Sequence, residues 1–258
     1  MSELTKTGQE ILDRAVAAAQ RLYSERYSDA KVIFLAGSIV RGEGTATSDL
    51  DLIVVYEKLE PARRETYIYD GFPVECFIHD PETLNYFYDL ARPGGFNPMA
   101  QMVLEGIEIP GPSEFSARIK ALARGYYEPG PPALTADDIL LARYSISNLL
   151  DDLDEPRSKW ELTGTGTELY KSLADLYLRA NGKWLAKNKS IPRALLKADP
   201  ELQQHFCEAF EELFAAGKTE KVAALTGEIL APHGGFIVDG FMHSASPGAR
   251  KKLDQYLS

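Results

Sequence analysis

Two short apolar segments, Val32–Ala36 and Leu50–Tyr56, constrain the fold of this chain more than any other feature of its sequence. Both are dominated by large aliphatic residues, a composition typical of strands that are buried on both faces of a sheet. An amphipathic helix is expected before them, over residues 5–24, where apolar side chains recur at three- and four-residue spacing. The first part of the chain is therefore predicted to be an α/β structure.

A β-hairpin is predicted after these segments. Its strands are Glu65–Tyr69 and Phe72–His79, joined by an Asp70-Gly71 turn. Pro73 has no amide hydrogen to donate, so we expect its strand to start at an edge of the sheet or to pair only beyond Pro73. Two helices are then expected, over Pro81–Leu90 and near Met99–Glu105.

The composition changes at Tyr127–Pro132, a proline- and glycine-rich stretch that we expect to be a stiff, non-helical linker. Beyond it the pattern is helical, beginning at Thr135, which forms a capping-box pattern with Asp138. We predict an α/β domain over residues 1–130 and a helical bundle over residues 131–258, and thus an α+β protein with a small mixed sheet followed by an all-α domain. Further helices are expected around Leu169–Ala180, Ile191–Lys197, Glu201–Ala216, Thr219–Leu230 and Pro247–Leu257, with a linker and helix start at Thr163–Thr167.

Charge and composition exclude some classes of partner. The formal net charge is −10, and binding to nucleic acid needs clustered Lys and Arg, so we expect no nucleic-acid partner and favour a neutral or cationic one. No run approaches the roughly 18 apolar residues of a membrane-spanning helix, and the first residues do not resemble a secretory signal. Only Cys76 and Cys207 are present, which predicts no disulfide framework and fits a cytoplasmic protein.

Asp49 and Asp51 are the first candidate site residues. They are two positions apart at the start of an apolar strand, so both carboxylates project from the same face. Two acidic groups held side by side on a strand built for burial cost stability unless a cation neutralises them. Oxygen ligands for a phosphate-bound Mg²⁺ would account for both residues.

Glu75 is the candidate for a third carboxylate. Val74, Cys76 and Ile78 alternate along its strand and form an apolar face, which places Glu75 on the opposite face. If this strand lies beside Leu50–Tyr56, Glu75 joins the two aspartates and either holds metal or takes a proton from an attacking hydroxyl. The alternative is an ordinary solvent-facing strand residue.

Gly37 and Ser38 follow directly after the first apolar segment. Glycine lets the backbone approach a phosphate closely, and the serine hydroxyl can donate to phosphate oxygens. Arg41-Gly42 is then expected to begin a helical turn or loop over the nucleotide.

These residues together resemble a known signature. Gly37-Ser38, then ten residues, then Asp49-x-Asp51 is similar to the motif of the DNA polymerase β-type nucleotidyltransferases. The Gly-Ser-x-x-Arg-Gly form is similar to the minimal nucleotidyltransferases and to bacterial aminoglycoside nucleotidyltransferases (adenylyltransferases). The resemblance implies that the two aspartates ligate Mg²⁺ and that Glu75 is the catalytic base or a further metal ligand.

The same resemblance implies a nucleotide site. Gly37 and Ser38 would contact the triphosphate, with Arg41 and Ser48 as further candidates. In such enzymes the helical domain supplies cations to the phosphates, and here we expect Lys187 or Lys189 to do so. A solvated basic helix end is the alternative for these lysines.

Three functions remain open from the sequence. The first, favoured by the acidic balance and the long helical half, is transfer of AMP from ATP, or of another nucleoside monophosphate, to a hydroxyl of a small, possibly aminoglycoside-like acceptor. The second is an antitoxin-like enzyme that adenylylates a protein, and the third is a non-catalytic nucleotide-binding module. The chain is expected to be a monomer or homodimer.

Overall fold

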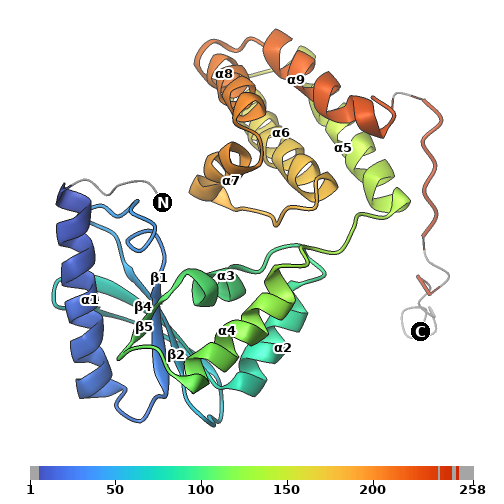
Figure 1. Ribbon diagram of the computed structural model, residues 1–258. Coiled ribbons are helices and arrows are strands. Elements are labelled where there is room, and N and C mark those ends of the chain that lie inside the picture. Colours follow the sequence, from blue (N-terminus) through green and yellow to red (C-terminus); the bar gives the residue numbers. More distant parts are fainter. Residues whose placement is uncertain (1–5, 238, 246–247, 250–258) are drawn as a thin grey trace, which may run out of the picture. The chain divides into compact units, whose positions relative to one another are not determined.

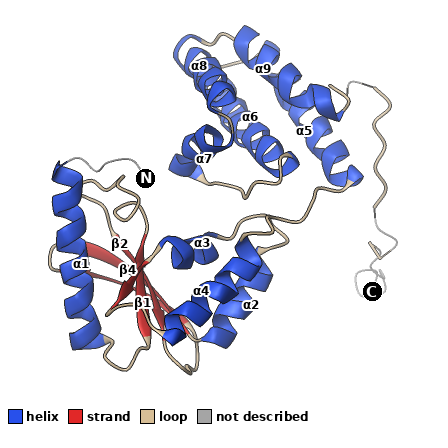
Figure 2. Ribbon diagram, viewed as in Figure 1, coloured by secondary structure: helices blue, strands red, loops and turns tan. Residues whose placement is uncertain are grey.

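The chain divides into two compact units, Met1–Pro132 and Ala133–Ser258, in the computed structural model, which describes residues 6–237, 239–245 and 248–249. The first unit contains a five-stranded mixed sheet with helices, and the second contains helices (Figure 2). This arrangement confirms the predicted α+β fold class. The division lies two residues beyond the boundary between 130 and 131 that the proline-rich segment suggested.

The sheet has the strand order β3-β4-β2-β1-β5. Strands β2 and β4 run parallel, and every other neighbouring pair is antiparallel. The hairpin strand β4 therefore lies directly beside β2, which was the condition for Glu75 to reach the aspartates. The strands are β1 (Val32–Ala36), β2 (Leu50–Val55), β3 (Arg63–Tyr69), β4 (Phe72–His79) and β5 (Ile107–Ile109).

Helices cover both faces of the sheet (Figure 1). One face packs on α1 (Lys6–Arg26), and the other packs on α2 (Pro81–Ala91), α3 (Pro98–Glu105) and α4 (Glu114–Tyr127). Side chains alternate along β2, so Leu52 faces α1 while Ile53 faces the other three helices. This double burial explains why β1 and β2 are apolar along almost their whole length.

Pro73 shows which of its two expected settings is correct. Strand β4 is an interior strand, so the edge alternative is wrong. Pro73 pairs with Ile68 of β3, whereas the pairing with β2 starts one residue later, at Val74 opposite Leu50. The missing amide hydrogen therefore falls where β4 has only one neighbour in the ladder.

Two elements of the first unit were not expected from the sequence, β5 and α4. Ser113 and Ser116 form a capping box at the start of α4, which is a signal that sequence reasoning missed. The expectation that all of Tyr127–Pro132 is non-helical is wrong at its first residue, because α4 ends at Tyr127 and Glu128 is its C-cap. Glu128 keeps αR dihedral angles although it precedes Pro129, a position where proline disfavours them, so helical geometry continues up to the proline.

The second unit packs around one apolar core. The capping box of Thr135 and Asp138 is confirmed at the start of the first helix. The helix expected over Pro247–Leu257 lies outside the described residues except for Gly248 and Ala249. Among the residues that the structure describes, no helix is long and apolar enough to cross a membrane. The helices of the unit are α5 (Ala136–Asp154), α6 (Lys159–Ala180), α7 (Ile191–Ala198), α8 (Pro200–Ala216) and α9 (Glu220–Leu230).

The segment Thr163–Thr167 is not the linker that we expected. It lies inside α6, which begins at Lys159 with Ser158 as N-cap. A Cβ atom at Gly166 would lie 2.9 Å from Leu213 Cδ2, so this glycine lets α6 and α8 approach closely. Tertiary packing thus accounts for a glycine that by local propensity argues against a helix.

Candidate active site

The structure brings the three predicted carboxylates together. Asp49 immediately precedes β2, Asp51 lies in β2, and Glu75 stands opposite Asp51 in the register of β2 with β4. One carboxylate oxygen from each lies within 4.8 Å of the others, and all three residues are half-buried. Three acidic groups at this separation repel one another, which makes the cluster suited to a cation with oxygen ligands. The metal-binding and catalytic roles of these residues stay predictions.

Gly37 makes room for Asp51. Its φ is +84°, and a Cβ atom there would lie 2.0 Å from Asp51 Oδ2, which is less than any tolerated contact. The aspartate side chain therefore lies directly against the glycine backbone. The sequence suggested that Gly37 admits a phosphate; the structure shows that it also admits a carboxylate of the cluster.

A turn follows β1 directly, and Arg41-Gly42 ends this turn, whereas a helical turn or loop was expected to begin there. The amide of Arg41 donates to the carbonyl of Gly37 at 3.3 Å, and the amide of Glu43 donates to the carbonyl of Ser38 at 2.9 Å. Ser48 accepts a hydrogen bond from the amide of Thr45 at 2.9 Å, and its hydroxyl lies 3.4 Å from the hydroxyl of Ser38. Ser38 and Ser48 are thus neighbours, both half-buried, although they are ten positions apart in the sequence.

Arg41 joins this turn to α3. Its guanidinium forms ion pairs with Glu105 at 2.6 Å and with Glu43 at 3.3 Å. Burial lowers the pKa of Arg41 but these two carboxylates raise it, and the net shift is upward. The nucleotide-binding role that the sequence suggested for Arg41 stays a prediction.

Arg64, which sequence reasoning missed, also belongs to the site. It lies on β3, its guanidinium forms an ion pair with Glu75, and its Cζ lies 5.1 Å from the centre of the Phe77 ring. Thr66 is directly opposite Glu75, so Arg64 is the diagonal neighbour of that carboxylate. The two-residue turn at Asp70-Gly71 fixes this register, and counting back from it would have found Arg64.

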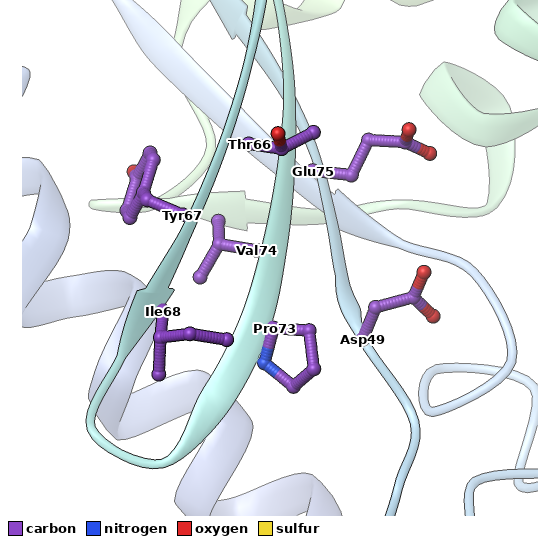
Figure 3. A pocket seen from close by; sticks show the side chains of 7 residues that line it. All are labelled: Asp49, Thr66, Tyr67, Ile68, Pro73, Val74 and Glu75. Atoms are coloured by element: carbon purple, nitrogen blue, oxygen red, sulfur yellow. The ribbon is translucent and has the colours of Figure 1, made fainter.

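A cavity of about 320 Å³ lies beside the cluster, where β2 joins the β3–β4 hairpin. Asp49 and Glu75 line it, and their carboxylates lie on the same side of the hairpin (Figure 3). The cavity therefore combines acidic oxygens with a hydroxyl and apolar surface. Its remaining lining residues are Thr66, Tyr67, Ile68, Pro73 and Val74.

Two other acidic residues near the motif have structural partners. Asp80 is the N-cap of α2 and accepts hydrogen bonds from the amides of Thr83 at 2.8 Å and Leu59 at 2.9 Å. Glu105 pairs with Arg41. Neither belongs to the carboxylate cluster, which leaves Glu75 as its third member.

Lys187 and Lys189 lie in the second unit. Lys187 directly precedes a 3₁₀ turn, Asn188–Ser190, that contains Lys189, and both residues are exposed. The loop after α6 is the place where phosphate-binding cations were expected. Contact of either lysine with a nucleotide stays a prediction.

No curated protein matches the sequence. Among solved structures, the chain is similar to a nucleotidyltransferase-like protein from Exiguobacterium sibiricum at 16% identity and a TM-score of 0.42, over 84% of this chain and 74% of that one. Residues 18–83, a segment that runs from α1 into α2 and contains the Gly-Ser turn and all three clustered carboxylates, match the family model of the nucleotidyltransferase domain.

Proposed function

We propose that this protein is a Mg²⁺-dependent nucleotidyltransferase that transfers AMP from ATP to a hydroxyl of a small molecule. One observation carries the proposal: Asp49, Asp51 and Glu75 converge within 4.8 Å inside a segment that matches the nucleotidyltransferase domain. The net charge of −10 favours a neutral or cationic acceptor, such as an aminoglycoside-like amino sugar.

The cluster fits a divalent cation. Mg²⁺ is held by one or two carboxylates together with substrate phosphates, and the half-buried oxygens of Asp49 and Asp51 offer such ligands. The space that Gly37 leaves for Asp51 supports this assignment, since any other residue would push the carboxylate away. When bound, the metal neutralises charge on the phosphates and polarises them for attack.

The residues of this chain then have separate tasks. Gly37 and Ser38 bind the triphosphate through backbone amides and the serine hydroxyl. Glu75 accepts the proton of the acceptor hydroxyl while the oxygen of that hydroxyl attacks the α-phosphorus. A new phosphate-ester bond forms, the bond between the α-phosphorus and the bridging oxygen breaks, and pyrophosphate leaves with the electron pair.

The test is the variant Asp51→Asn, assayed for pyrophosphate release from labelled ATP with Mg²⁺ and a panel of aminoglycosides and uncharged polyols. We expect turnover to vanish and Mg²⁺-ATP binding to weaken while the fold is retained. Asp70→Asn is the matched control, because Asp70 is an exposed carboxylate of the same unit at a φ of 50° that asparagine tolerates. Undiminished release by Asp51→Asn contradicts the proposal, and ATP binding by the wild type without pyrophosphate release with any acceptor favours a non-catalytic module.

A further inference from the structure

The ion pair between Arg64 and Glu75 is a feature that the proposed reaction does not explain. The Glu75 side chain is 22% exposed, whereas that of Arg64 is 61% exposed. A cation from the edge strand β3 thus reaches the carboxylate that accepts the proton in the proposed reaction. The pair lies at the cluster itself, so the positive charge of Arg64 acts on Asp49 and Asp51 as well.

Arg64 is positioned by more than its charge. Its guanidinium carbon lies 5.1 Å from the centre of the Phe77 ring, and Phe77 is the residue directly opposite Arg64 in the β3–β4 register. Cation–π contact and strand pairing both hold the side chain on the carboxylate face of the hairpin. Because the guanidinium is largely exposed, moving it off Glu75 into water costs little.

We propose that Arg64 is a resident counter-ion of the carboxylate cluster whose positive charge opposes a divalent metal held by Asp49 and Asp51, so that metal binding and release of Arg64 from Glu75 are coupled. This inference rests on the proposed function, because it takes the carboxylate cluster as the metal site. Without metal, Arg64 offsets part of the charge of three carboxylates. With metal bound, like charges repel, and Arg64 leaves Glu75 free to act on the acceptor hydroxyl.

Arg64 is a positioning residue in this scheme, since it acts through Glu75. Linkage requires the coupling to be reciprocal. If bound metal weakens the Arg64–Glu75 ion pair by a given factor, the ion pair weakens metal binding by the same factor. For two charges a few ångströms apart near a protein surface, removal of the guanidinium is expected to tighten metal binding about three- to tenfold, with a smaller effect at high salt.

The experiment titrates the full-length protein with Mn²⁺ alone and measures free Mn²⁺ by electron paramagnetic resonance. Arg64→Met removes the charge and keeps an unbranched stem against Phe77, and it is expected to bind Mn²⁺ about three- to tenfold more tightly than the wild type. Arg64→Lys keeps a positive charge and is expected to restore wild-type affinity within about twofold. Arg63→Met is the matched control, because Arg63 is the adjacent residue of β3 and pairs with Glu65, outside the cluster.

A second measurement needs no variant. Adding Mg²⁺ to the wild type should speed hydrogen exchange of the Arg64 guanidinium, followed by NMR, because the metal displaces it from Glu75. Unchanged exchange overturns the inference, as does Mn²⁺ affinity in Arg64→Met that is unchanged, weaker, or raised no more than in Arg63→Met.

Failure of the proposed function gives a different result. If Asp51→Asn binds Mn²⁺ as tightly as the wild type, the cluster is not the metal site and the proposed function fails with the inference. If Asp51→Asn loses Mn²⁺ but Arg64→Met gains nothing, the metal site stands and only the role of Arg64 is wrong.

Discussion

Gly37 occupies a position where a single Cβ atom decides the geometry of the carboxylate cluster. Its positive φ alone would favour glycine, and the approach of Asp51 Oδ2 leaves no space for a side chain. Gly71 provides a comparison within the same unit, because its φ of +79° is similar but nothing lies within 4 Å of its missing Cβ. An alanine at Gly71 would therefore meet backbone strain alone, whereas an alanine at Gly37 would meet the same strain and a steric clash with Asp51.

Gly37→Ala is expected to lower metal affinity at least tenfold, because the new methyl group displaces Asp51. Gly71→Ala carries the same left-handed strain, of roughly 1–2 kcal/mol, and should leave metal affinity within about twofold of the wild type. Mn²⁺ titration and urea unfolding measure the two effects separately. Equal metal affinity in both alanine variants would show that Asp51 tolerates the displacement or is not a ligand.

Glu75→Gln separates chemistry from binding. Glutamine keeps the size of the side chain but cannot accept a proton, so turnover should fall about 10²–10⁴-fold while ATP affinity stays within a few-fold. Parallel loss of affinity and turnover would make Glu75 mainly a metal ligand. Glu57→Gln, at a side chain that is 73% exposed, is the control and should change neither quantity. Unchanged kinetics in Glu75→Gln would show that Glu75 is an ordinary solvent-facing strand residue with no part in the reaction.

His79 predicts a pH dependence of stability. Burial lowers its pKa to about 4, and Asp80 offsets this only in part. Between pH 6.5 and 4 the unfolded chain binds a proton that the folded protein excludes, so the stability contribution is complete above pH 6.5 and is lost as the pH falls. The loss is about 2 kcal/mol at pH 5 for one group with these values. The pKa of Asp80 is lowered, so its own contribution is lost only at more acidic pH, as the pH falls below 3.8.

His79→Gln should therefore flatten the fall in stability between pH 7 and pH 5. Both tryptophans, Trp160 and Trp184, lie in the second unit, so their fluorescence does not report on this core. Amide hydrogen exchange of peptides from β2 and β4 is the suitable measurement. His205→Gln, at a side chain that is 50% exposed in the second unit, is the control. An equally steep fall in His79→Gln would assign the dependence to other groups.

At the scale of elements, helix α6 shows local propensity overridden by packing. Gly164 and Gly166 both weaken a helix on their own. Gly164 is exposed with nothing within 4 Å of its missing Cβ, whereas Gly166 is buried against Leu213 and Phe214 of α8. The sequence alone does not distinguish the two glycines, and it therefore predicts a linker at a segment that is helical in the structure.

Gly164→Ala is expected to stabilise the second unit by up to about 1 kcal/mol, because alanine favours the helix and meets no neighbour. Gly166→Leu should destabilise it by roughly 1–3 kcal/mol through overpacking between α6 and α8. Urea unfolding followed by tryptophan fluorescence measures both, since both tryptophans belong to this unit. A gain in stability for Gly166→Leu would show that the helices separate without cost.

At the scale of the whole molecule, each unit has its own apolar core. Residues 1–132 and 133–258 are therefore expected to fold as separate fragments. We expect the first fragment to bind ATP more weakly than the whole chain, because Lys187 and Lys189 are predicted to supply phosphate contacts. Circular dichroism and calorimetry with Mg²⁺-ATP test both parts.

A double variant in the full chain identifies the source of any loss. Replacing Lys187 and Lys189 with alanine should weaken ATP binding about as much as removing the second unit. Replacing Lys218 and Lys221, which pair with Glu212, is the control with the same charge change. A first fragment that binds ATP as tightly as the whole chain would give the second unit another role.

The sequence by itself determined four of the five strands, β1 to β4, and the face of the sheet on which the acidic residues of β2 and β4 project. Apolar runs in β1 and β2 and the two-residue turn of the hairpin are local signals, so these strands and the shared face of Asp49 and Asp51 were predictable. Even Glu75 was correctly placed on the face opposite Cys76, because alternation along a strand needs no tertiary information.

Only the tertiary structure decided which strands are neighbours and which glycines are crowded. Strand order depends on long-range packing, and the parallel pairing of β2 with β4 is what brings Glu75 to Asp51. The ion pair of Arg64 and the closeness of α6 to α8 at Gly166 arise in the same way, from segments that meet only after folding. Local propensity acts over a few residues, whereas these contacts depend on how whole elements bury their apolar faces.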